Sequence, residues 1–331
     1  MSKKTVLASQ QLNPLAMELL RDQVEVRVAT NPKPSTLARE VVGAHAIVLR
    51  LGEVTAEVIA AADRLEVIGR NGVGLDAVDL AAATARGIAV VYTPDANSVS
   101  VAEHVVGAAL ALARNYPTVD REIKAGNWAI RERFNRELHG ATFGFVGLGR
   151  IGSLAARMCR GAFDAEILAY DPYLKPEAAT RAEATLVPSL EELLHRADVV
   201  SLHVALTPQT TGLIGARELG MMRPTAYLVN ASRGPVVDET ALVEALRSGT
   251  IAGAALDVFE TEPIGAAHPL CSLPNVVLTP HNAAQTREAS ERVTRTLMAD
   301  LLAVLSGRKQ RLRGRACSRR RPRPSPQLPD R

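Results

Sequence analysis

A glycine-rich turn places the tightest constraint on the fold of this chain. Gly147, Gly149 and Gly152 form the pattern G-x-G-x-x-G directly after the apolar run 142–146 and directly before a helix-like stretch. In this context the first glycine permits a tight turn, the second lets backbone approach a pyrophosphate, and the third lets the helix pack on the strand. The amide groups at the helix start would bind the anion. The pattern therefore predicts a dinucleotide site, with Arg150 and Ile151 as further cofactor contacts.

An acidic residue follows the next predicted strand. Asp171 lies 19 residues after Gly152, close to the position where a dinucleotide fold places the acid that binds the adenosine ribose. A carboxylate there repels the 2′-phosphate of NADP, and no arginine immediately follows it. We therefore predict NAD as the cofactor. The alternative interpretation is a capping or turn role for Asp171 before Pro172.

Two series of short apolar runs alternate with helix-like stretches, and this alternation is typical of βαβ units around a parallel sheet. The first series predicts strands near residues 5–8, 24–28, 46–49, 66–69 and 88–91. The second series predicts strands near residues 142–146, 166–169, 199–202, 226–229, 253–256 and 276–278. We expect an α/β protein with two doubly wound parallel-sheet domains, a flavodoxin-like catalytic domain and a Rossmann NAD-binding domain.

Two long helices set the expected domain boundaries. A mostly apolar helix should begin at Ser98 and bridge the domains, and an amphipathic helix over 288–305 should end at Gly307 and pack on either domain. We predict a catalytic domain from residues 1–98 and 284–310, and a cofactor domain from residues 99–283. The candidate active site should lie between them.

The charge of the chain is concentrated at its end. Residues 311–331 hold eight arginines against one acid, so the net charge of +4 hides a body of about −3. A segment of Arg and Pro without apolar periodicity predicts a disordered basic tail, and we consider nucleic acid an unlikely partner.

The three cysteines share no metal or redox spacing, so we expect no metal site. The start lacks a secretion-signal core and no run is long enough to span a membrane, which predicts a cytoplasmic protein.

Ionisable residues follow three of the later strands, at the edge where open α/β sheets bind ligands. Arg233 follows the run at 226–229, Asp257 and Glu262 follow that at 253–256, and His281 follows that at 276–278. Arginine matches a carboxylate with a planar fork of donors, and histidine can exchange protons near neutral pH. Taken singly, the arginine and the glutamate could form surface ion pairs, and the histidine could be structural.

These residues, in this order and spacing, resemble the D-isomer-specific 2-hydroxyacid dehydrogenases, the family of phosphoglycerate dehydrogenase and glyoxylate/hydroxypyruvate reductase. The resemblance covers residues 1–307. Besides the glycine fingerprint and the three segments above, it rests on the turn at residues 71–76 and the helix start at residues 97–104.

The resemblance implies a role for each residue. Arg233 would bind the substrate carboxylate and polarise the reacting oxygen, His281 would exchange the proton, and Glu262 would pair with His281 and favour its charged form. Further contacts implied in the same way are the amides of Val73 and Gly74 to the carboxylate, Asp257 to the nicotinamide amide, and His203 to the adenosine side. A homodimer is expected as well, with Trp128 and its neighbours as a contact arm.

The substrate itself is left open by the sequence. Arg50, Arg70, Arg131 and Arg133 are candidate ligands of a substrate phosphate, with Arg50 as the expected substrate contact, but Glu53 adds a negative charge near Arg50. We expect reduction of hydroxypyruvate or glyoxylate at least as well as turnover of a 3-phosphoglycerate-type substrate. The alternative from another class is an NAD(H)-sensing binding protein that resembles the C-terminal-binding corepressors.

Overall fold

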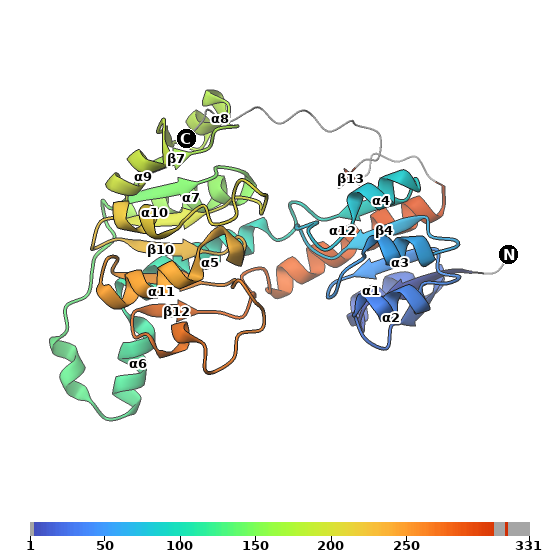
Figure 1. Ribbon diagram of the computed structural model, residues 1–331, viewed down its shortest axis with the longest axis horizontal. Coiled ribbons are helices and arrows are strands. Elements are labelled where there is room, and N and C mark those ends of the chain that lie inside the picture. The colour runs from blue at the N-terminus through green and yellow to red at the C-terminus, as the bar shows by residue number, and fades with distance from the viewer. Residues whose placement is uncertain (1–2, 308–314, 317–331) are drawn as a thin grey trace. The chain divides into compact units, whose positions relative to one another are not determined.

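The computed structural model describes residues 3–307 and 315–316 (Figure 1). The chain divides into two compact units. Within the described residues, the first combines residues 3–97 with residues 290–307 and 315–316, and the second consists of residues 98–289. The chain therefore crosses between the units twice.

The sheet of the first unit has five parallel strands in the order β5-β4-β3-β1-β2 within the described residues. They are β1 (Lys4–Ala8), β2 (Val24–Val28), β3 (Ala46–Leu49), β4 (Val67–Arg70) and β5 (Ala89–Tyr92). This is the flavodoxin-like strand order. A two-residue strand, β13 (Arg315–Ala316), pairs antiparallel with β5. The rest of the tail predicted to be disordered lies outside the described residues.

Two hydrophobic layers cover this sheet because its side chains alternate between the two faces. One face packs against α2 (Pro34–Glu40), α3 (Ala56–Ala61) and α4 (Leu80–Ala85). The other packs against α1 (Pro14–Leu20) and the C-terminal part of α12 (Arg287–Leu305). Leu297 and Leu301 of α12 are fully buried there, and Leu301 lies 3.2 Å from the position that a Cβ on Gly69 would take. The terminal helix thus completes the core of the first unit.

The sheet of the second unit has seven parallel strands, in the order β8-β7-β6-β9-β10-β11-β12 within the described residues. They are β6 (Thr142–Val146), β7 (Glu166–Tyr170), β8 (Thr185–Leu186), β9 (Val199–Leu202), β10 (Tyr227–Asn230), β11 (Gly253–Leu256) and β12 (Val276–Leu278). This is the Rossmann order with one further strand at its end. The order reverses between β6 and β9, which is where such a sheet binds its ligand.

Helices cover both faces of the second sheet (Figure 1). On one face lie α5 (Ser98–Ala113) and α7 (Arg150–Phe163), and on the other lie α9 (Leu190–Arg196), α10 (Ala216–Met221) and α11 (Glu239–Ser248). Helix α8 (Pro176–Arg181) precedes β8. Helix α5, which we expected to bridge the domains, packs along its whole length within the second unit because Val105, Ala109 and Leu112 face its core.

Short elements complete the second unit. The segment of residues 116–134, called the arm here, contains α6 (Tyr116–Lys124) and the 3-10 helix η1 (Trp128–Glu132). Two further 3-10 helices are η2 (Gly234–Val236) and η3 (Pro269–Ser272). None of the described helices is both long and apolar enough to cross a membrane.

The predicted fold class is confirmed, and every predicted strand is present within one residue at each end. The two strands that the sequence did not indicate, β8 and β13, have two residues each. Runs that short carry no alternation to detect.

Candidate active site

The predicted site residues of the second unit all follow strands at one edge of the sheet. The fingerprint follows β6, Asp171 follows β7, and the three catalytic candidates follow β10, β11 and β12. Because the seven strands are parallel, these residues lie at the same carboxyl edge. Strands β10, β11 and β12 are neighbours, which brings the loops of Arg233, Glu262 and His281 together.

Each of the three glycines of the fingerprint has a different structural role. Gly147 has φ +89°, and a Cβ there would lie 2.8 Å from the carbonyl oxygen of His203. A Cβ on Gly152 would lie 2.5 Å from the carbonyl oxygen of Gly147, so this glycine lets α7 approach the turn. A Cβ on Gly149 would meet nothing within 4 Å.

This open space lies at the amino-terminal end of the 14-residue helix α7, which begins at Arg150 and continues through Ile151. The first amide groups of a helix have no partner within the helix and attract anions. The turn therefore fits a pyrophosphate: two glycines are required by packing, and the third leaves the approach to the amides free.

Asp171 is tied to the fingerprint turn. Its Oδ2 accepts a hydrogen bond from the Leu148 amide at 3.0 Å, and its Oδ1 accepts one from the Tyr173 amide at 3.0 Å. The carboxylate thus has the turn role that we considered as the alternative. It also stands beside the fingerprint, at the end of the strand next to β6, where a ribose diol would lie.

His203 follows β9 and lies against the same turn. Its ring stacks on Phe145 with ring centres 5.6 Å apart, and its Nε2 lies 2.9 Å from the hydroxyl of Ser201. Burial lowers the pKa of His203 to about 4. The ring is therefore neutral near pH 7, and this histidine is unsuited to donate a proton to a substrate.

His281 and Glu262 form a direct pair. Nδ1 of His281 lies 2.7 Å from Oε2 of Glu262, and Oε1 of Glu262 accepts a hydrogen bond from the Phe259 amide at 3.1 Å. His281 itself has φ +51°, in the left-handed region that side chains other than glycine rarely adopt. Such backbone persists only where surrounding contacts hold it, and it is concentrated at functional sites.

The contacts that hold His281 come from Asp257, which is 2% exposed. Its Oδ1 accepts hydrogen bonds from the Thr279 hydroxyl at 2.6 Å and from the Asn282 amide at 2.9 Å, and its Oδ2 accepts one from the Ala283 amide at 2.9 Å. Asp257 thus fixes the loop on both sides of His281. We predicted it as a nicotinamide contact, which stays a prediction; what the structure shows is this structural role.

Arg233 is positioned by a residue that the sequence analysis missed. The buried Asn230, at the end of β10, donates from Nδ2 to the Arg233 carbonyl at 2.9 Å and accepts at Oδ1 from the Ser232 amide at 3.0 Å. An asparagine at the last position of an otherwise apolar strand is the signal that could have revealed it. A Cβ on the next residue, Gly234, would lie 1.9 Å from the carbonyl group of Phe259, so the loops of Arg233 and Glu262 touch backbone to backbone.

The remaining substrate candidates lie in the first unit, again after neighbouring strands. Arg50 follows β3 and is exposed, while Val73 and Gly74 lie in the loop after β4. Arg70 shapes that loop, because its guanidinium donates to the carbonyls of Gly74 at 3.1 Å and Asn71 at 2.8 Å.

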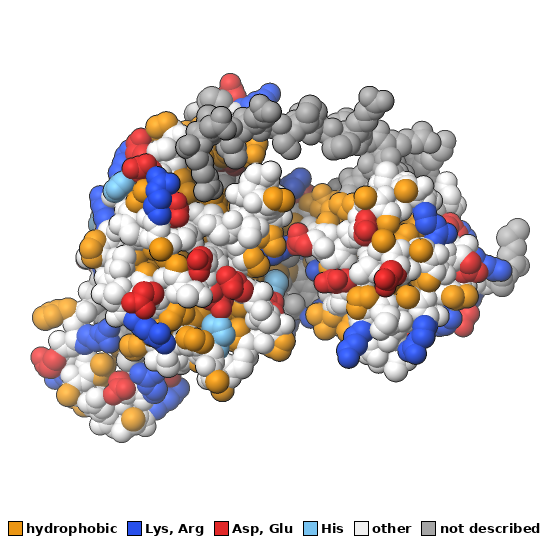
Figure 2. Space-filling model, in the orientation of Figure 1, with side chains coloured by type: hydrophobic (Ala, Val, Ile, Leu, Met, Phe, Trp, Pro, Cys, Tyr) orange, Lys and Arg blue, Asp and Glu red, His pale blue; other side chains and the backbone are white. Residues whose placement is uncertain are grey.

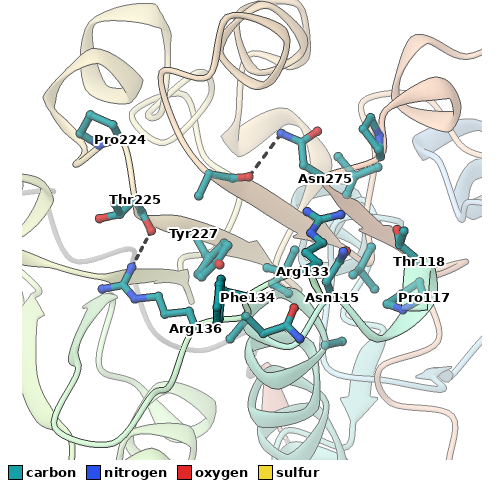
Figure 3. A pocket seen from close by; sticks show the side chains of 18 residues that line it. Asn115, Pro117, Thr118, Arg133, Phe134, Arg136, Pro224, Thr225, Tyr227 and Asn275 are labelled. Carbon is teal, nitrogen blue, oxygen red and sulfur yellow. Dashed lines mark hydrogen bonds between the residues drawn. The ribbon is translucent and has the colours of Figure 1, made fainter. Parts of the chain in front are cut away.

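The other two arginines that we considered for a phosphate, Arg131 and Arg133, lie in or beside η1 of the second unit. Arg133 also lines a cavity of about 590 Å³ near the amino-terminal ends of β10 and β12 (Figure 3). Tyr227 and Val276 begin these strands, so the cavity lies at the sheet edge opposite the fingerprint. It is therefore separate from the candidate active site.

Comparison with known proteins identifies the family of this chain. Residues 106–283 match the family described as "D-isomer specific 2-hydroxyacid dehydrogenase, NAD binding domain". The chain belongs to this family. The matched segment contains the fingerprint, Asp171, Arg233, Glu262 and His281, and it lies within the second unit.

Two curated relatives of the family are each 43% identical to this chain. The D-3-phosphoglycerate dehydrogenase of Archaeoglobus fulgidus aligns over 304 residues, which are 91% of this chain and 57% of the relative. The chain thus spans little more than half the length of that relative. The glyoxylate reductase of Thermofilum pendens aligns over 283 residues, 83% of each chain. Among solved structures, the TT0316 protein from Thermus thermophilus has a TM-score of 0.86 at 37% identity and covers 95% of this chain and 100% of its own.

Proposed function

We propose that this protein is an NAD-dependent oxidoreductase that acts at C2 of a small D-2-hydroxy acid or 2-oxo acid. The observation that carries the proposal is the His281–Glu262 pair, 2.7 Å apart, whose loop packs against that of Arg233. Both lie at the sheet edge that holds the dinucleotide fingerprint. The named relatives, a dehydrogenase and a reductase, support an enzyme over an NAD(H)-sensing binding protein.

Each side chain has a task in this reaction. Bound NAD(H) supplies or accepts the hydride at C2. His281 exchanges a proton with the C2 oxygen through Nε2, because Nδ1 faces Glu262. The guanidinium of Arg233 offers a fork of donors that matches the substrate carboxylate and polarises the C2 oxygen. We assign Asp257 to the nicotinamide amide and the amides of Val73 and Gly74 to the carboxylate.

We also propose that the first unit is the substrate-binding domain and that its substrate is an unphosphorylated 2-oxo acid, such as hydroxypyruvate or glyoxylate. A phosphate group needs several cations. Arg50 has Glu53 three residues away, and Arg70 donates to backbone carbonyls. Arg133 lines the cavity at the sheet edge opposite the fingerprint, and Arg131 lies in η1 of the same arm. These observations support a site with few cations available for a phosphate.

A turnover assay tests the proposal. NADH oxidation would be followed with hydroxypyruvate, glyoxylate and 3-phosphohydroxypyruvate, in the parent protein and in the His281→Ala variant. We expect turnover of the two unphosphorylated acids in the parent and loss of at least two orders of magnitude in the variant. A far higher kcat/KM for the phosphorylated acid would overturn the substrate class. Tight NADH binding without any turnover would favour the NAD(H)-sensing alternative.

A homodimer formed through the arm is part of the same proposal. The arm exposes large apolar side chains, among them Trp128 at 69% and Phe134 at 99%, and hydrophobic surface is visible on it in Figure 2. Phe134 also lines the cavity at the amino-terminal edge (Figure 3). Exposed apolar patches of this kind mark interaction sites. Static light scattering should give a dimer for the parent and a monomer for Phe134→Asp, whereas Tyr173→Asp, at an exposed position outside the arm, should remain dimeric. A monomeric parent would refute the dimer.

A further inference from the structure

A cluster of three side chains lies next to the Glu262 loop and has no part in the proposed chemistry. Glu239, at the start of α11, places Oε1 2.7 Å from Nε2 of His268. Glu239 and Glu260 also exchange hydrogen bonds. The Glu260 amide donates to Oε2 of Glu239, and the Glu239 amide donates to Oε1 of Glu260, both at 3.3 Å. We call Glu239, Glu260 and His268 the brace.

The brace connects the start of α11 to two points in the connection between β11 and β12. Glu239 follows the Arg233 loop, Glu260 precedes Glu262 by two residues, and His268 lies beyond Glu262 in the connection to β12. His268 therefore holds the part of the loop that follows Glu262, while Glu260 holds the part that precedes it. Both contacts end on the carboxylate of Glu239.

The contact between Glu239 and His268 is more shielded from solvent than an ordinary surface pair. The side chains of Glu239 and His268 are only 15% and 22% exposed, so solvent screens their interaction poorly. Glu239 lies in the first turn of α11, where the helix dipole favours a negative charge. The His268 ring also packs edge-on against the buried Phe259, with ring centres 6.4 Å apart.

Phe259 is the link from the brace to the reacting groups. Its amide donates to Glu262, and its carbonyl group contacts the backbone at Gly234, next to Arg233. A shift of Phe259 would therefore change the position of the Glu262 carboxylate against His281 and would also disturb the Arg233 loop.

We propose that Glu239 and His268 are positioning residues that act through Phe259 to align Glu262 with His281 and to hold the Arg233 loop. The inference rests on the proposed function and adds two residues to its machinery. Neither is expected to touch the substrate or the cofactor. Nδ1 of His268 faces the Leu270 amide at 3.4 Å, so the neutral ring can carry its proton on Nε2 and donate it to Glu239.

The test compares His268→Leu, which removes the donor to Glu239, with His268→Gln, whose amide nitrogen can replace Nε2 as the donor. With hydroxypyruvate and NADH, His268→Leu should lower kcat about tenfold, less than the 10²-fold that a 1 Å misplacement costs. It should also move the alkaline limb of the rate profile to lower pH. KM for NADH should change less than twofold, and His268→Gln should recover most of the loss.

Arg223→Gln is the matched control, because Arg223 also pairs with a largely buried carboxylate, Asp198, at 3.0 Å but at the opposite edge of the sheet. It should leave the pH profile unchanged even if stability falls. If His268 contributes to stability alone, His268→Leu should lower the melting temperature without moving the alkaline limb of the rate profile. That result would overturn the proposal.

A second measurement does not depend on turnover. The imidazole of His281 can be titrated by NMR, with its signal identified by its absence in His281→Ala. Its titration midpoint should fall in Glu262→Gln and, by a smaller amount, in His268→Leu, and it should be unchanged in Arg223→Gln. Equal midpoints in the parent and in His268→Leu would refute the brace even if the enzyme is active. Absence of turnover with a shifted midpoint would refute the proposed function and leave the brace intact.

Discussion

His281 donates from Nδ1 to Oε2 of Glu262, 2.7 Å away, while its backbone has a φ of +51°. The side chain is thus held by the loop after β11, and the backbone is held by Asp257. Two separate sets of contacts fix one imidazole. This arrangement points to a ring whose orientation and charge matter, and it leads to the first prediction.

Glu262→Gln should move the pH dependence of the reaction. The change keeps the size and hydrogen-bonding ability of the side chain but removes the charge that favours the imidazolium form. Reduction needs the imidazolium, so the alkaline limb of its rate profile should move to lower pH. Oxidation needs the neutral ring, so the acid limb of the rate profile for oxidation should also move to lower pH. Rate profiles in both directions would show this, with a deuteride isotope effect to verify that chemistry limits the rate. An unmoved profile would mean that Glu262 does not control His281.

Gly149→Val should block the dinucleotide without harming the fold. A Cβ at Gly149 meets nothing within 4 Å, so added carbons would occupy the space assigned to the pyrophosphate. We expect the dissociation constant of NADH, measured by fluorescence titration, to rise at least tenfold while the melting temperature changes little. Gly161→Ala is the control on the same helix, because its Cβ would also meet no atom within 4 Å. Unimpaired binding in Gly149→Val would place the pyrophosphate elsewhere.

Asp171→Ser should narrow the preference for NAD(H) over NADP(H). The carboxylate at the end of β7 repels a 2′-phosphate, and charge-assisted hydrogen bonds to the ribose contribute about 1.5–3 kcal/mol. A loss of that size corresponds to about tenfold or more in the ratio of kcat/KM values for the two cofactors. Glu177→Gln removes an exposed charge farther along the chain and should leave the ratio unchanged. Equal efficiency with both cofactors in the parent would contradict this role of Asp171.

Gly234→Ala should lower both thermal stability and turnover far more than Gly265→Ala does. A Cβ at Gly234 would lie 1.9 Å from the carbonyl carbon and oxygen of Phe259, whereas one at Gly265, in the same connection to β12, would meet nothing within 4 Å. Overpacking of this kind costs about 1–3 kcal/mol. We expect Gly234→Ala to lower the thermal midpoint and also kcat, because the Arg233 and Glu262 loops must separate. Similar behaviour of the two variants in thermal unfolding and turnover would show that these loops do not depend on each other.

Asp198 should make the second unit sensitive to acid. Burial raises the pKa of this carboxyl group, but hydrogen bonds from the Thr142 amide, Arg136 and Arg223 outweigh that effect, so its pKa is lowered below the ordinary 3.8. A carboxyl group with a lowered pKa stabilises the fold above about pH 4 and loses that contribution as the pH falls through its folded value.

Asp198→Asn should therefore be less stable than the parent at pH 7, and the difference should shrink below about pH 4. Urea unfolding at pH 7, 5 and 3.5 would measure it. Glu183→Gln is the control, because its ion pair with Arg160 is about half exposed on both sides. It should differ little from the parent at any pH. If the difference in the free energy of unfolding between Asp198→Asn and the parent is the same at all three pH values, this pH dependence is wrong.

The sequence by itself determined the two series of strands and the α/β fold class. Apolar runs and glycine spacing are local signals, and they depend on a strand burying both faces and on a turn that only glycine can form. That is why the two series of strands and the fingerprint at Gly147 could be located directly. The order of Arg233, Glu262 and His281 after successive strands placed them at one edge, because parallel strands share their carboxyl ends.

Tertiary structure alone decided how those side chains are held. Asn230, Asp257 and the brace of Glu239, Glu260 and His268 act across loops whose conformation follows no period, so no pattern in the sequence indicates their partners. Glu239 and His268 are brought within 2.7 Å only when α11 and the connection to β12 pack together. The apolar face of the terminal helix was evident in the sequence, whereas the residues that bury it are known only from the structure, in which Leu297 and Leu301 lie in the core of the first unit. An amphipathic pattern states that a face must be buried, whereas the partner that buries it is chosen by the complementary shape of the whole fold.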